Sequence, residues 1–99
     1  MTTNRSELKR AVHVLLNDVV EQCFQNMIHY PQHSSELNRI IKDATDEINY
    51  LTLKIDAHDF PNDSPELKDH FKTISKDTHK KSLRLLGSLQ NLQSKQKTH

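Results

Sequence analysis

The sequence contains one glycine, one cysteine and no tryptophan among its 99 residues. A glycine-rich phosphate loop needs several residues without a Cβ so that backbone can approach phosphate, and one glycine excludes it. All-β sandwiches need glycine in their many turns, so a single glycine also argues against this fold class. A lone cysteine excludes an internal disulfide. What the chain does contain is 33% apolar and 27% charged residues with a net charge of +1, a balance typical of a folded domain.

Long apolar runs are also missing. The densest apolar stretch near the N-terminus covers only residues 12–16, which is too short for the core of a signal peptide. No stretch approaches the roughly 20 apolar residues that a membrane span needs. We therefore expect a cytoplasmic protein without a membrane segment, in which residues 1–99 form one domain.

Apolar residues recur at alternating steps of three and four in three segments, which predicts three amphipathic helices. The first helix is predicted over residues 5–30, where a proline follows, and the second over 35–58. The third is predicted over 65–93, because it opens with a cap, a proline and an acidic residue in succession. Residues 94–99 are expected to form a frayed tail.

Short connections place successive helices antiparallel, so the predicted fold is all-α, an antiparallel up-down-up three-helix bundle. Cys23 falls on the apolar stripe of the first helix, where a free cysteine behaves as a small buried hydrophobe. A chain this short buries a small core, and we therefore expect the bundle to be oligomeric.

The apolar pattern is interrupted in the third predicted helix. Residues 75–82 carry no apolar side chain, which opens a gap of about 12 Å along the bundle. Three arrangements would cover it. Thr78 faces inward with the methylenes of Lys80 or Lys81 over the seam; the helix breaks and a short fourth helix begins at Leu83; or another chain fills the groove. The chain's one glycine, further along this helix, marks a kink or a close helix crossing.

Charge is divided along the sequence. Residues 1–67 hold six Lys/Arg and eleven Asp/Glu, a net of −5, whereas residues 68–99 hold eight and two, a net of +6. Within the third helix, cations recur every four residues and form a basic ridge: Lys68, Lys72, Lys76, Lys80 and Arg84. The ridge either pairs with the acidic second helix or binds phosphates of nucleic acid or anionic lipid. The near-zero net charge and the lack of interleaved aromatic residues argue against nucleic acid.

Seven histidines raise the question of a metal site. His58 and His70, with acidic neighbours, flank the turn between the second and third helices, and a cation could bind at that corner. The residue spacing of a dedicated zinc or di-iron site is absent. Paired carboxylates lie on helix surfaces without a predicted cleft. We therefore expect no catalytic activity, no metal and no cofactor.

These observations predict a non-catalytic protein–protein interaction module, such as an adaptor, a chaperone, an immunity protein or antitoxin, or a regulatory subunit. Its partner is a protein or a second copy, bound through an apolar face of the third helix. The residues predicted to make this contact are Thr78, Lys81, Leu83, Leu86, Leu89 and Leu92. The alternative is a nucleic-acid-binding helical bundle that uses the basic ridge.

Overall fold

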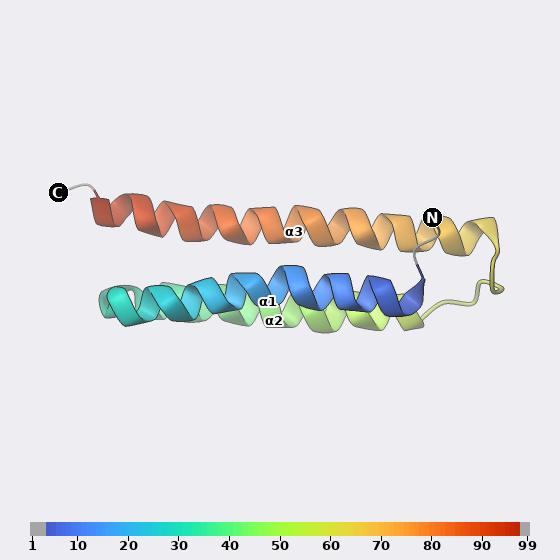
Figure 1. Cartoon of the computed structure of the whole chain (residues 1–99), viewed down its shortest axis with the longest axis horizontal. Coiled ribbons are helices and arrows are strands. Elements are labelled where there is room, and N and C mark those ends of the chain that lie inside the picture. The colour runs from blue at the N-terminus through green and yellow to red at the C-terminus, as the bar shows by residue number, and fades with distance from the viewer. Residues whose placement is uncertain (1–3, 98–99) are drawn as a thin grey trace.

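The computed structural model describes residues 4–97, with side chains through Gln93, and is helical almost throughout. Its elements are α1 (Arg5–His29), the 3-10 turn η1 (Pro31–His33), α2 (Ser34–Asp56) and α3 (Pro65–Lys97). The chain runs along α1, turns back through η1 into α2 and turns again into α3, which gives a rod of 56 × 18 × 17 Å (Figure 1). The prediction of an all-α chain whose three helices pack on one another is confirmed.

None of these three helices, within the range the structure describes, is long and apolar enough to cross a membrane.

Local capping explains where α1 and α3 begin. The side chain of Asn4 accepts a hydrogen bond from the backbone N–H of Glu7 at 2.8 Å, which satisfies a free donor at the start of α1. The hydroxyl of Ser64 does the same for the N–H of Leu67 at 3.1 Å, directly before Pro65 opens α3. Both helices therefore begin at the residues that the sequence predicts.

The third helix is one continuous element of 33 residues, so the predicted alternative of a break and a fourth helix is wrong. It extends to Lys97, past the predicted end at residue 93. Gly87 marks no close helix crossing, because a Cβ placed there would meet nothing within 4 Å. The polar residues of the interrupted stretch support this continuity, since lysine, serine and threonine each cost a helix less than glycine and far less than proline.

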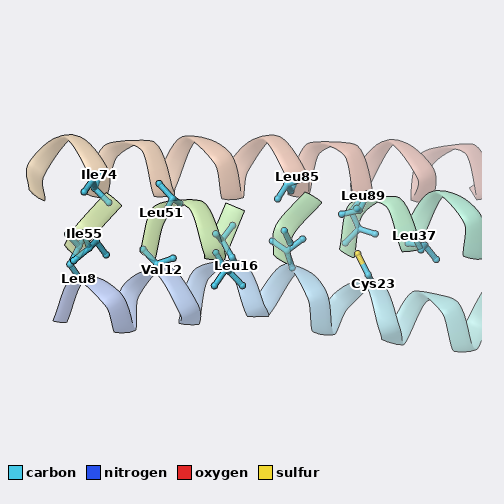
Figure 2. Packing of buried hydrophobic residues seen from close by; sticks show 14 of the residues in the cluster. Leu8, Val12, Leu16, Cys23, Leu37, Leu51, Ile55, Ile74, Leu85 and Leu89 are labelled. Carbon is cyan, nitrogen blue, oxygen red and sulfur yellow. The ribbon is translucent and has the colours of Figure 1, made fainter. Parts of the chain in front are cut away.

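The hydrophobic core runs the length of the rod and takes one stripe of side chains from each helix (Figure 2). Each fully buried leucine or isoleucine contributes roughly 1.5–3 kcal/mol relative to an exposed one. The buried apolar residues are Leu8, Val12, Leu16, Val19 and Cys23 of α1, Leu37, Ile40, Ala44, Ile48, Leu51 and Ile55 of α2, and Leu67, Phe71, Ile74, Leu85, Leu89 and Leu92 of α3.

A polar layer fills the core where the apolar pattern of α3 is interrupted. Thr78 is 1% exposed and Ser82 is 4% exposed. The Thr78 hydroxyl donates to the carbonyl of Ile74 at 2.8 Å, and the Ser82 hydroxyl donates to the carbonyl of His79 at 3.0 Å. Both hydroxyls are thus satisfied within their own helix, which removes the cost of burying them. The prediction that Thr78 faces inward is confirmed.

Candidate interaction surface

The residues predicted to bind a partner do not form one accessible surface. Thr78, Leu89 and Leu92 are at most 8% exposed and belong to the interior of the bundle. Leu86 packs against the core and is partly buried. Leu83, at 68% exposure, is the one leucine of this set that points into solvent. The prediction therefore requires correction, because it took core leucines of α3 for a free surface.

Lys81, the remaining member of that set, closes the seam between α3 and α2. Its ammonium pairs with the carboxylate of Glu47 and lies 4.9 Å from the centre of the Tyr50 ring. The ammonium of Lys54 lies 5.1 Å from the centre of the same ring. Cation–π contacts at exposed sites contribute roughly 0.5–1 kcal/mol each. These cation–π contacts were not predicted from the sequence. The spacing of four residues between Tyr50 and Lys54 indicates the contact between those two residues, but nothing in the sequence indicates the contact with Lys81.

The basic ridge lies on the outward side of α3, and all five of its side chains are exposed. A step of four residues advances about 40° beyond a full turn, so the ridge crosses the side of the helix opposite the core. Among the ion pairs of residues 4–93, none includes a ridge residue. The interpretation that the ridge pairs with α2 is wrong: Glu47 pairs with Lys81, Asp46 with Lys42, and Asp56 with α1.

Leu83 is surrounded by this ridge. It follows Lys76 by seven residues and Lys80 by three, and Arg84 is its direct neighbour, so all three cations lie within two helical turns of it. We refer to Lys72, Lys76, Lys80, Leu83 and Arg84 together as the α3 outer face. It is one apolar side chain within a group of cations that make no ion pair among the residues described.

The corner between α2 and α3 holds a cluster of aromatic rings. The ring centroids of His58 and His70 lie 5.7 Å apart, with Phe60 and Phe71 packed at 5.9 and 6.1 Å from His58. Nε2 of His70 donates to the carbonyl of Lys54 at 2.8 Å. Within the described part of the chain, no group of three or more His, Cys, Asp or Glu residues is arranged to hold a metal ion. The corner therefore fixes the turn against the two helices.

Among the residues whose side chains are described, two titratable groups have shifted pKa values. A hydrogen bond from Lys9 at 2.7 Å, with the nearby charge of Arg5, holds the pKa of Asp56 below its usual range. Burial raises the pKa of the Cys23 thiol to about 11. Cys23 is fully buried and stays protonated at neutral pH, which makes it a poor nucleophile. Both shifts thus follow from the packing of α1.

A hollow of about 460 Å³ lies where the start of α1, the 57–64 turn and the start of α3 meet. Its apolar lining comes from Leu67 and Phe71, and its polar lining includes Asn4, Arg5 and Lys68. No hydrogen bond or ion pair joins these polar residues to one another within residues 4–93. The α3 outer face thus remains the candidate functional surface.

Comparison with protein-family models, with curated proteins and with solved structures gave no match to this chain.

Proposed function

We propose that the chain is a non-catalytic protein–protein interaction module, an antiparallel up-down-up bundle that binds a protein through the α3 outer face. The observation that carries this proposal is Leu83, which is 68% exposed among exposed cations. Protein interfaces combine an apolar centre with a polar, solvent-accessible rim, and this face has both. The partner surface that complements it is helical and carries acidic side chains around an apolar contact.

The rod shape supports this use. Three packed helices hold α3 straight over its whole length, so the cations and Leu83 are presented at fixed spacing without a loop that must be ordered on binding. A preorganised surface loses less conformational entropy on association. Adaptors, assembly chaperones, antitoxins and regulatory subunits all need such a surface, and the proposal covers this class.

A photocrosslinking amino acid at position 83 tests the proposal in cells that express the chain. Leu53 provides a matched control, because it is 67% exposed on α2, away from the α3 outer face. We expect covalent adducts from position 83 that nuclease treatment leaves intact, and few from position 53. Equal adducts from both positions, or none from position 83, would overturn the proposal.

A second candidate function is nucleic-acid binding along the basic ridge. It is favoured by the exposure of all five cations, which span sixteen residue steps of α3, or about 24 Å. The logarithm of the binding constant for duplex DNA would then fall linearly with the logarithm of the salt concentration. Replacing both Lys76→Glu and Lys80→Glu is expected to abolish retention on immobilised duplex DNA. Unchanged retention rejects this candidate, and nuclease-sensitive adducts from position 83 favour it.

A further inference from the structure

The side of the bundle formed by α1 and α3 carries unlike charges on its two helices. Glu7, Val14 and Asp18 of α1 are exposed, and their spacing of seven and four residues places them on one side of the helix. We refer to these three residues as the α1 outer face. Among the ion pairs of residues 4–93, none joins α1 to α3. The acidic residues of this face and the cations of the α3 outer face are therefore without a partner of opposite charge there.

Hydrogen bonds locate the α1 outer face beside α3. The amide of Gln93, on α3, contacts the side-chain oxygen of Asn26 at 3.4 Å, which places Asn26 in the seam between α1 and α3. Asn26 donates to the carbonyl of Gln22 at 2.8 Å, and Gln22 donates to Asp18 at 2.9 Å. Steps of four residues turn about 40° around the helix, so this line leads from the seam outward to Asp18. On α3, steps of seven residues back from Gln93 turn about 20° each and lead outward in the same way to Lys72, next to Lys76 and Leu83. The same side of the bundle thus presents the α1 outer face together with Lys72, Lys76 and Leu83 of the α3 outer face, whereas Arg84 lies about 120° further round α3 than Lys72.

We infer that a second copy of this chain docks on this side, in a homodimer whose two-fold axis runs parallel to the helices. The inference rests on the proposed function, because it names the partner of the α3 outer face. α1 and α3 run in the same direction (Figure 1). Rotation about such an axis therefore lays the α1 outer face of each copy along the α3 outer face of the other, in parallel and at unchanged height.

The contact between Asn26 and Gln93 fixes the register of that pairing. These residues are 67 positions apart and lie at the same height along the bundle. Because α1 and α3 run in the same direction, every residue of α1 lies at the height of the α3 residue 67 positions later. Glu7 is therefore level with residue 74, midway between Lys72 and Lys76. Each cation is then two residues, or about 3 Å along the axis, from the height of the carboxylate. Each Glu7 of the dimer thus meets two cations of the other copy.

The apolar residues match in the same register. Val14, 59% exposed, is level with residue 81 and so about 3 Å in height from Leu83. Leu15 and Leu86 are partly buried at the edges of the same side. In the dimer, Val14 of each copy would thus contact Leu83 of the other copy, so this contact occurs twice. The charge pairs would fix the relative direction and the register of the two copies.

The area of this side suits a dimer. A face as long and as wide as the rod, 56 Å by 17–18 Å, presents on the order of 1,000 Å², and a standard interface buries ~800 Å² on each partner. Nucleic acid fits the same side less well, because phosphates laid along α3 would lie next to Glu7 and Asp18. A second copy uses the charges of both helices.

Two charge-reversal variants test the inference with the whole chain. Glu7→Lys places like charges at both contacts of the homodimer, and so does the variant that combines Lys72→Glu with Lys76→Glu. Light scattering after gel filtration of nuclease-treated protein is expected to give a dimer for the wild-type chain at about 50 mM salt and a smaller dimer fraction at about 1 M, where the Debye length is about 3 Å. We expect each variant alone to raise the dissociation constant about tenfold or more.

Mixing the two variants provides the sharpest readout. In a mixed dimer every reversed residue meets its opposite charge, so an equimolar mixture is expected to regain the dimer that neither variant forms alone. A loss of folding cannot produce this rescue. Asp43→Lys, on an exposed position of α2 outside this side, makes the same change in net charge as Glu7→Lys and is expected to leave the dimer intact.

Three outcomes would overturn the inference: a wild-type monomer at low salt, an equal loss of dimer in the Asp43→Lys control, or a mixture that stays monomeric. A wild-type monomer combined with nuclease-resistant adducts from position 83 would refute the second copy and leave the proposed function standing. A monomer without such adducts would refute both.

Discussion

Replacing Gly87→Ala is expected to stabilise the fold, although it alters the one glycine of the chain. Gly87 lies inside α3, 22 residues after the first residue of the helix and ten before the last. Its φ is not positive, and a Cβ at its position meets nothing within 4 Å. Neither of the usual reasons for glycine, a left-handed conformation or a close approach of another segment, therefore applies.

The expected gain follows from helix propensity. Glycine costs a helix interior about 0.8–1.0 kcal/mol relative to alanine, largely because the unfolded chain loses more freedom when glycine is fixed. Since no contact of the new methyl group opposes it, the full difference is expected as added stability. In a domain of this size, 1 kcal/mol corresponds to a rise in Tm of about 4–8 °C.

Urea unfolding followed by far-ultraviolet circular dichroism measures this change, in about 1 M salt so that self-association contributes little. Ser88→Ala is the matched control: it lies on the next, exposed position and should gain about 0.5 kcal/mol or less. A lower stability of Gly87→Ala would refute the reasoning, because it would mean that another segment approaches α3 at this point.

Two further predictions concern groups with shifted pKa values. Because the pKa of folded Asp56 lies below its usual range, its stabilising contribution is present above the unfolded pKa of about 3.9 and is lost as the pH falls through the folded value. Asp56→Asn is therefore expected to lower the urea midpoint at neutral pH, and the difference from the wild-type chain should shrink as the pH falls through the folded pKa of Asp56. A constant difference across the pH series would contradict the Lys9 contact. Cys23, fully buried with a pKa raised to about 11, should react with iodoacetamide at mildly alkaline pH only after the chain unfolds, and rapid labelling of the folded protein would contradict its burial.

The helices of this protein are determined by local sequence. Asn4 and Ser64 cap α1 and α3 through hydrogen bonds to residues three positions away, and the proline after Tyr30 ends α1. Such interactions depend only on neighbours in the chain, so the sequence predicts the helix starts closely. The same holds for Cys23, whose burial follows from the period of the pattern around it.

Tertiary packing determines which leucines of α3 are buried. The predicted contact set steps by three residues, from Leu83 to Leu92, and each such step turns about 60° away from the previous residue. Leu83 and Leu92 therefore point in opposite directions, one 68% exposed and the other 8%. Alternating steps of four and three, as from Ser82 through Leu85 to Leu89, stay on one side and form the core. Leucines are present on several sides of this helix, so its own sequence does not select the buried stripe.

The electrostatic contacts were also decided by tertiary packing. The pairs Lys81–Glu47 and Lys9–Asp56 join residues far apart in the sequence, and they leave the basic ridge exposed. Charge composition gives the number and sign of these groups, but which acid meets which cation depends on the rotation and height of each helix against its neighbours. Those two quantities are set by the fit of the buried side chains, because the core gains far more free energy than an exposed ion pair does.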